Sequence, residues 1–210
     1  MNSSKLESFI ERWIFGSRKT ILWTFSLVTL AMIIFASQIK IDASFEKNIP
    51  LEHEYMQTYI KHQEHFGGAN RVLLVLEDTS GDIFNRDYFK ALSEATNQVA
   101  SINSVSESLM SSLFTPNTRF VEAVEDGLVG GPVIPASFDG SQEQLQLVRN
   151  NVLKAGIVGR SVANNFASAM VSAQLLSIDP ETKEKTDLVG VANNLEAIRT
   201  DLEAKYPQIK

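Results

Sequence analysis

The feature that most constrains this chain is an uncharged run at residues 20–39, most of them apolar, bounded by Lys19 and Lys40. As an α-helix the run is about 30 Å long, which is the thickness of the hydrocarbon core of a bilayer. No other segment of the chain has an apolar run of comparable length. The sequence therefore predicts one transmembrane helix near the N-terminus, followed by a domain outside the membrane.

A cleaved signal peptide is the alternative interpretation of this run. The apolar region of a signal peptide has about 7–15 residues and ends at a small-x-small cleavage site. Residues 20–39 exceed that length, and Ala36, Ser37 and Gln38 match the cleavage pattern poorly. We therefore expect an uncleaved anchor.

The charges on the two sides of the run predict its orientation. Lys5, Arg12, Arg18 and Lys19 precede it, whereas Lys40 alone follows it closely. Basic residues concentrate on the cytoplasmic side of membrane proteins. We expect residues 1–19 in the cytoplasm and everything after Lys40 outside.

Aromatic and basic residues mark the expected ends of the membrane helix. Trp13 and Trp23 are typical interfacial anchors, and Lys19 and Lys40 complete the predicted flanks. Five apolar residues before the run share one helical face: Leu6, Phe9, Ile10, Trp13 and Ile14. This pattern indicates a short helix on the inner membrane surface; a cytosolic tail without a fixed position is the alternative.

Net charge differs between the two parts of the chain. The whole chain carries −6, and residues 1–40 contain five basic and two acidic residues, so residues 41–210 carry −9. An acidic domain argues against nucleic acid or anionic head groups as its ligand. The chain has no cysteine, which excludes disulfides, a thiolate nucleophile and cysteine metal sites.

The first half of the external part is predicted to be strand–helix–strand, after a linker and helix at 41–66. The continuous apolar run 71–77 predicts a buried central strand. Asn85 caps a helix whose apolar residues repeat at helical spacing up to Ile102. Residues 105–114 predict a second, weaker strand.

The second half begins with a break in the pattern. Residues 115–140 contain seven glycine and proline residues, which predicts an irregular insertion with at most a short helix at 119–126. Residues 141–144 form a capping box that opens a helix. Residues 166–178 predict a long strand, and 188–202 have the cleanest amphipathic helical pattern of the chain.

This order of elements predicts an α+β fold. One transmembrane helix is followed by an incomplete ferredoxin-like (split βαβ) subdomain at residues 67–210 that lacks its final strand. In the usual strand order of that unit the fourth strand lies beside the first. We therefore expect residues 72–76 to form an open, apolar sheet edge.

Four short motifs near the first strand carry a resemblance to a known family. They are Ser44-Phe45, Asn48-Ile49-Pro50, His65-Phe66-Gly67-Gly68-Ala69-Asn70, and Glu77-Asp78 followed by Gly81-Asp82-Ile83-Phe84. With the preceding span, they resemble the RND (resistance–nodulation–division) exporters, in the branch of the MMPL lipid exporters and Patched-like proteins. In that family a first transmembrane helix leads directly into an external porter subdomain of this fold.

The resemblance implies a function and a place in the cell. It implies the N-terminal part of a proton-driven exporter of hydrophobic or lipid-like molecules, in a bacterial inner membrane, with the bulk of the chain periplasmic. The implied partners are the lipid bilayer, a lipid-like substrate, and the remaining transporter segments or an oligomer. A signal-anchored periplasmic sensor or interaction domain is the alternative.

The resemblance assigns no energy-coupling residue to this chain. Exporters of this family use ionisable residues in later membrane helices, and residues 20–39 contain no ionisable residue. The chain corresponds to only the first part of a full-length transporter. We therefore expect a fragment that does not transport alone.

Histidines are the first candidates for chemistry. His53, His62 and His65 belong to one predicted helix, and the spacing of His62 and His65 allows a shared metal. A solvated helix face is the favoured interpretation, and we expect no metal and no cofactor.

The remaining motifs point away from catalysis. Residues 78–82 are rich in oxygen but lack the bidentate glutamate of a calcium loop, so they predict a strand-to-helix turn. Gly127, Gly130 and Gly131 do not follow a predicted strand, which argues against a phosphate-binding loop. All three histidines lie within 53–65, so no other histidine is present to activate a serine. We expect no enzyme, and the sequence assigns no substrate-binding residue.

Overall fold

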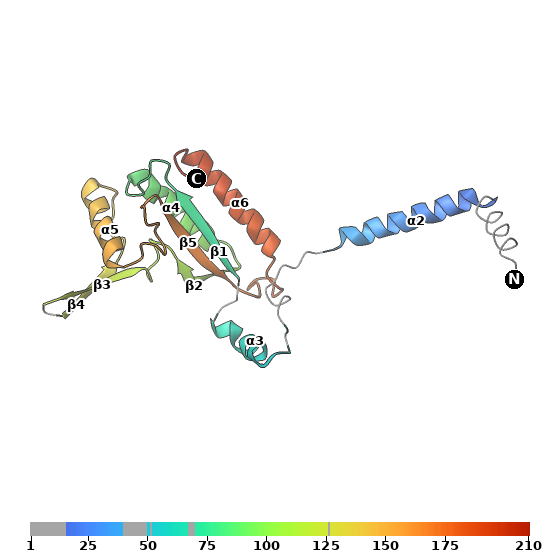
Figure 1. Ribbon diagram of the computed structural model, residues 1–210, viewed down its shortest axis with the longest axis horizontal. Coiled ribbons are helices and arrows are strands. Elements are labelled where there is room, and N and C mark those ends of the chain that lie inside the picture. Colours follow the sequence, from blue (N-terminus) through green and yellow to red (C-terminus); the bar gives the residue numbers. More distant parts are fainter. Residues whose placement is uncertain (1–15, 40–49, 51, 67–69, 126) are drawn as a thin grey trace. The chain divides into compact units, whose positions relative to one another are not determined.

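The computed structural model describes residues 16–39, 50, 52–66, 70–125 and 127–210, and its contacts divide the chain into two units, Met1–Asp42 and Ala43–Lys210 (Figure 1). The structure is mixed α+β, with a long apolar helix in the first unit and small sheets in the second. The extended stretch predicted at 41–47 lies outside the described residues, as do Trp13 and Lys40.

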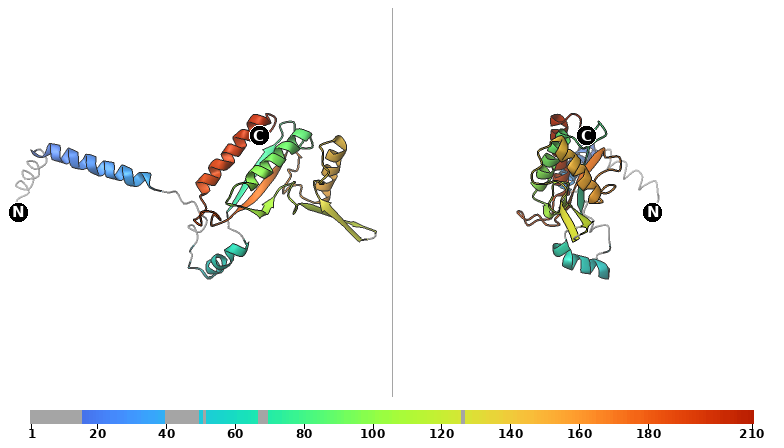
Figure 2. Two further views of the ribbon diagram at one scale, coloured as in Figure 1. Left: turned by 180° about the vertical axis from the view of Figure 1, so that it is seen from behind. Right: turned by 90° about the vertical axis from the view of Figure 1, so that its left-hand side faces the viewer.

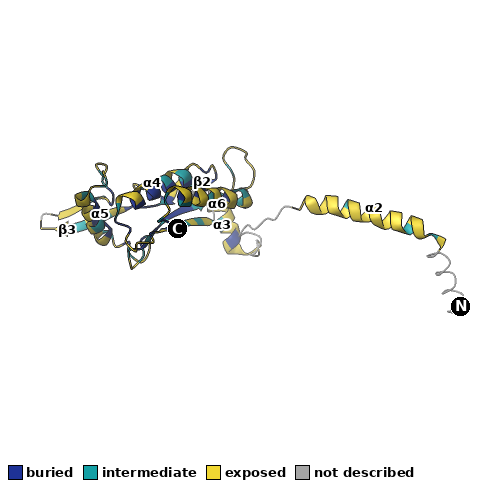
Figure 3. Cartoon of the chain, turned by 90° about the horizontal axis from the view of Figure 1, so that it is seen from above, coloured by how far each residue is buried: buried dark blue, intermediate teal, exposed yellow. Residues whose placement is uncertain are grey.

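The first unit contains α2 (Arg18–Ser37), which is long and apolar enough to cross a membrane. Its bounds agree with the helix predicted at 20–39 within two residues. None of its residues is buried, and Figure 3 shows it as an almost continuously exposed ribbon. An α-helix suits an apolar run because all of its backbone hydrogen bonds form within the segment.

The second unit is built on a three-stranded sheet in the order β1-β5-β2. Its strands are β1 (Arg71–Glu77), β2 (Val105–Ser111) and β5 (Ser168–Leu175). β5 lies in the centre and runs antiparallel to both neighbours, so β1 and β2 run parallel to each other. The predicted strands at 105–114 and 166–178 are therefore present but shorter. β1 is an edge strand, as the lack of a complete fourth strand predicted. The prediction that 71–77 is a buried central strand is wrong, because β5 takes the central place and only Leu76 of β1 is buried.

Two helices complete the core of this unit. α4 (Arg86–Ala100) packs on β5 and β2, and α6 (Leu188–Lys205) packs on α4; both cover one face of the sheet (Figure 2). Side-chain burial alternates along β1 as a result. Leu76 is buried beneath the helices, whereas Leu73 and Val75 are exposed on the opposite face. Such alternation is typical of a sheet covered on one side.

The capping signals in the sequence are confirmed. The Asn85 side chain accepts a hydrogen bond from the Tyr88 N–H and caps α4. The Ser141 hydroxyl accepts one from the Gln144 N–H and caps α5 (Gln142–Lys154). In each case a polar side chain satisfies an N–H group that has no partner inside the helix.

The predicted irregular insertion at 115–140, with at most a short helix at 119–126, is wrong. β3 (Arg119–Val124) and β4 (Gly127–Pro132) form a regular antiparallel hairpin, which extends away from the three-stranded sheet (Figures 1 and 2). The glycines support the pairing instead of breaking it: a Cβ atom on Gly130 would lie 2.8 Å from the carbonyl oxygen of Phe120. The hairpin needs glycine there for close approach of its two strands.

The helix predicted before the first strand is α3 (Glu54–Phe66). Its start is later than the signal at Asn48 and Pro50 indicated, and Asn48 lies outside the described residues. Of the α3 side chains that the structure describes, that of Met56 is buried.

Candidate functional site

The predicted membrane anchor is the first candidate site. Lys19 and Trp23 are both exposed on α2, and Trp23 retains 76% of its accessible surface. The Thr24 hydroxyl donates to the carbonyl oxygen of Thr20, and the Ser37 hydroxyl donates to that of Ile34. These bonds satisfy polar side chains within the helix itself, which is how hydroxyl groups are accommodated in lipid.

The exposed edge of β1 is the second candidate. On the inner side, the Asn70 carbonyl oxygen accepts from the N–H of Leu175 in β5, and the Asp78 N–H donates to Ala167, which directly precedes β5. Because backbone groups alternate in direction along a strand, the N–H and C=O groups of Arg71, Leu73 and Val75 point away from β5.

The far end of that edge is occupied by the last residues of the chain. Glu77 and Lys210 exchange two backbone hydrogen bonds, of 2.8 and 2.9 Å, and the Thr79 N–H donates to Gln208 at 2.9 Å. Ile209 lies opposite Asp78 in an antiparallel bridge and is 3% exposed. The sequence did not predict this pairing of residues 208–210 with β1. Pro207 indicates the end of a helix and gives no sign of a following β-ladder.

The oxygen-rich segment after β1 is a strand-to-helix turn, as predicted. The buried Asp78 carboxylate accepts hydrogen bonds from the Ser80 N–H at 2.8 Å and the Asn85 side chain at 2.7 Å. Asp82 accepts from the Phe84 N–H and pairs with Arg149. Burial acts to raise the pKa of Asp78, but the hydrogen bonds outweigh it and hold the pKa below its usual value.

Tyr88 connects the edge strand β1 to the central strand β5 from beneath. Its hydroxyl donates to the carbonyl oxygen of Leu76 at 2.8 Å and accepts from the Ala169 N–H at 2.7 Å. The side chain is fully buried, and this burial raises the pKa of the phenol above its ordinary value. The tyrosine therefore has a structural role at the centre of the sheet.

The histidines do not assemble a metal site in the described part of the chain. His53 precedes α3 and stacks on the ring of Tyr55, with centroids 5.3 Å apart. His62 is exposed on α3, and the side chain of His65 lies outside the described residues. Among the residues that the structure describes, no group of three or more histidine, cysteine or carboxylate side chains is placed to hold a metal.

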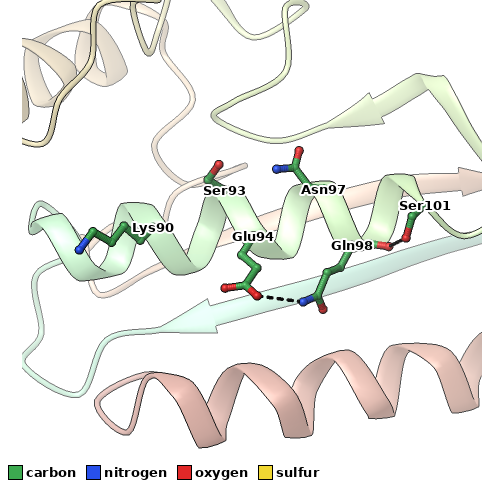
Figure 4. Close-up of a pocket in the computed structure, with 6 residues that line it drawn as sticks. All are labelled: Lys90, Ser93, Glu94, Asn97, Gln98 and Ser101. Carbon is green, nitrogen blue, oxygen red and sulfur yellow. Dashed lines mark hydrogen bonds between the residues drawn. The ribbon is translucent and has the colours of Figure 1, made fainter.

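A hollow of about 490 Å³ lies along the polar face of α4. Figure 4 shows the six side chains that line it, all from this one helix: Lys90, Ser93, Glu94, Asn97, Gln98 and Ser101. Glu94 is already engaged, since it accepts from Gln98 and Tyr206 and pairs with Lys205. No large apolar side chain lines the hollow, unlike a typical small-molecule site, so we assign it no ligand.

The β3–β4 hairpin carries exposed apolar side chains that the sequence analysis did not identify. Val121, Leu128 and Val129 keep 63%, 76% and 52% of their accessible surface. Lys154 of α5 pairs with Glu122, in the middle of β3, at 2.6 Å and so joins the hairpin to α5. A projecting apolar ribbon of this kind is typical of a surface that contacts a partner.

No protein-family model, curated protein or solved structure matches this chain. The functional conclusion therefore depends on the sequence motifs and on the geometry described above.

Proposed function

We propose that this chain is the first transmembrane helix and the external porter subdomain of an RND-type exporter of hydrophobic or lipid-like molecules. In this proposal α2 crosses a bacterial inner membrane with its N-terminus in the cytoplasm. The second unit lies in the periplasm, where it forms part of the substrate path of the complete transporter.

The strand order β1-β5-β2 is the observation that carries this proposal. Two parallel strands are joined through α4, and a third strand lies antiparallel between them before α6. This connectivity supports the assignment of a ferredoxin-like, split βαβ unit without a complete fourth strand. The order of these elements along the chain was expected from the sequence, which also has the RND-like motifs around β1.

The character of α2 also supports the proposal. Residues 20–39 contain no charged side chain, and α2 buries none of its residues. A helix that is apolar all round and packs on nothing is suited to lipid. Because residues 20–39 contain no ionisable side chain, this span supplies no proton path, so energy coupling is assigned to other segments of a transporter.

A membrane-anchored interaction domain is the second candidate. The exposed apolar residues of the β3–β4 hairpin favour it, since such a surface binds a partner without any transport step. The two candidates differ in what they require of the gene. The exporter requires further membrane helices, and the interaction domain does not.

Sequencing the parent gene beyond the codon for Lys210 tests the proposal directly. An exporter predicts an open frame with several further hydrophobic spans and a second strand–helix–strand pattern. A stop codon immediately after Lys210, in a gene that is expressed as such, contradicts the exporter and favours the interaction domain.

A further inference from the structure

A second hollow, of about 590 Å³, adjoins the one on α4 and shares Gln98 and Ser101 with it. We call it the α6 hollow, because half of its lining comes from α6 and the residue that caps it. Unlike the first hollow, it has an apolar floor, formed by Ile102, Val191 and Ile198, each at most 9% exposed. These three residues belong to the hydrophobic core, so the hollow reaches the surface of the core. Apolar walls with a few polar groups are typical of small-molecule sites.

The α6 hollow begins where the polar contact between α4 and α6 ends. Gln98 of α4 donates to Asp201 of α6 at 3.1 Å, and its side chain points toward α6 in Figure 4. Past this pair, α6 contributes Gly190 and Ala197 to the lining. Because these residues have little or no side chain, the space between the two helices stays open.

The loop before α6 closes the far side of the hollow. It is tied to the turn after α4 by three hydrogen bonds. The Leu176 N–H donates to the carbonyl oxygen of Ser104 at 2.8 Å, and the Ser104 hydroxyl donates to Asp179 at 3.1 Å. The Asn103 side-chain amide donates to Glu181 at 2.6 Å. The walls of the hollow are therefore joined to each other by the fold itself.

The polar side chains around the hollow present mainly acceptors. Gln98 donates both of its amide protons to carboxylates, which can only accept, so its carbonyl oxygen remains available. The hydroxyl protons of Ser101 and Ser104 are likewise donated within the protein. Spare side-chain protons remain on Asn103 and Asn194. A ligand that donates hydrogen bonds therefore fits this rim better than one that accepts them.

Asp187 is one of two carboxylates in the lining. One of its oxygens caps α6 by accepting from the Val189 N–H at 3.1 Å. The other oxygen lies against Gly190, where a Cβ atom would be only 2.6 Å away. Within the part of the chain that the structure describes, this second oxygen accepts no hydrogen bond and forms no ion pair. Glycine at position 190 thus leaves room for a carboxylate oxygen that is free to bind a donor.

Asp179 is the other carboxylate. The N–H groups of Thr182 and Glu181 donate to it at 3.0 and 2.9 Å, and these bonds hold its pKa below the usual value. Lys183 and Lys185 belong to the same loop but do not line the hollow, and no basic residue is present among the described residues of the lining. The hollow is therefore negative at neutral pH, in a domain that itself carries an excess of acidic residues.

We propose that the α6 hollow binds a small organic cation, with an ammonium group at Asp179 and Asp187 and an apolar body on Ile102, Val191 and Ile198. The ammonium supplies the donors that the rim lacks, and the apolar body covers the core side chains at the floor. The two carboxylates disfavour an anion of the same size. The proposal goes beyond the assignment to an exporter and does not depend on it.

Titration of the full chain in nonionic detergent micelles tests the proposal. The probe is 2-phenylethylammonium, and the control is 2-phenylethanol, which has the same apolar body without the charge. Amide NMR shifts of Gly190 and Ser101, on two sides of the hollow, report binding. Amides of α2 report any uptake of the probe by the micelle. We expect saturable shifts at Gly190 and Ser101, and an affinity for the ammonium about fivefold or more above that for the alcohol.

Two pairs of variants locate the ligand. Ala197→Leu fills the hollow and is expected to weaken binding by about tenfold or more, whereas Ala192→Leu, at an exposed position of α6 outside the lining, should not change it. Asp187→Asn removes a charge but keeps a good helix cap, and should weaken binding by about two- to fivefold. Glu184→Gln makes the same charge change outside the lining and is its control. Unchanged amide signals of β5 show that each variant is folded.

Four results would overturn the proposal. Absence of saturable shifts at Gly190 and Ser101 contradicts the site, and equal affinity for the ammonium and the alcohol contradicts the role of charge. Equal effects of the two leucine substitutions place the probe elsewhere. Equal effects of Asp187→Asn and Glu184→Gln reduce the attraction to the overall charge of the domain. Each of these results is independent of whether the chain belongs to an exporter.

Discussion

The Tyr88 hydroxyl donates a 2.8 Å hydrogen bond to the carbonyl oxygen of Leu76, so a helix side chain holds the edge strand of the sheet from below. The Tyr88 hydroxyl oxygen in turn accepts a hydrogen bond from the N–H of Ala169 on the central strand β5. One phenol thus satisfies backbone groups of two neighbouring strands in a site without solvent. Buried polar backbone groups are costly when unpaired, which gives the hydroxyl a measurable role.

Replacing Tyr88 by phenylalanine is expected to destabilise the domain by about 1–3 kcal/mol, because Leu76 and Ala169 each lose a buried partner. Urea unfolding of the full chain in detergent micelles, followed by far-UV circular dichroism, measures the change. Tyr55→Phe is the matched control, since Tyr55 is 80% exposed, and its effect should stay within about 0.5 kcal/mol. Equal effects of the two substitutions would contradict the role of the hydroxyl.

Burial raises the pKa of Tyr88, which predicts how stability changes in alkali. A group whose folded pKa exceeds its unfolded value stabilises the fold fully below the unfolded pKa, about 10 for tyrosine, and loses this contribution above it. The stability difference between wild type and Tyr88→Phe should therefore shrink by about 1 kcal/mol between pH 9 and pH 11. Unfolding curves at the two pH values measure it; an unchanged difference would mean that Tyr88 ionises freely in the fold.

The hairpin depends on Gly130 more than on its neighbour. A Cβ atom at Gly130 would lie 2.8 Å from the carbonyl oxygen of Phe120, whereas one at Gly131 would meet only the Phe120 ring at 3.4 Å. Gly130→Ala should thus separate the strands and speed amide exchange across β3 and β4, and Gly131→Ala should change it little. Similar exchange in the two variants would show that the backbone approach does not hold the hairpin.

Local and periodic signals predicted much of the fold. The uncharged run fixed α2, the capping residues Asn85 and Ser141 located two helices, and the run at 71–77 located β1. Each of these signals acts within a few residues of the feature that it specifies. The split βαβ order placed residues 72–76 at an open edge, as observed, whereas the apolar run at 71–77 had indicated a buried central strand, a place that β5 holds.

The sequence did not predict the β3–β4 hairpin or the Gln208–Lys210 ladder, because both depend on contacts between separate segments of the folded chain. Glycine usually indicates a loop. At Gly130 it instead allows close approach to the carbonyl oxygen of Phe120, which only the folded structure reveals. Gln208–Lys210 is too short for a strand signal, and its partner, Glu77–Thr79, is distant in the sequence. No pattern in a local window of sequence contains either relationship.

The central claim is an uncleaved anchor with the N-terminus inside and the folded domain outside. Because the chain has no cysteine, single-cysteine variants at Ser3 and Ser137 report the two sides without background. Ser137 is exposed in the domain, and Ser3 precedes the anchor. Both variants, expressed in bacteria, are treated with a membrane-impermeant maleimide before and after the inner membrane is dissolved.

The account predicts that Ser137→Cys is labelled in intact cells with a permeabilised outer membrane, and that Ser3→Cys is labelled only after detergent dissolves the inner membrane. Labelling of Ser3→Cys in intact cells, protection of Ser137→Cys, or a mature protein that has lost residues 20–39 would contradict it.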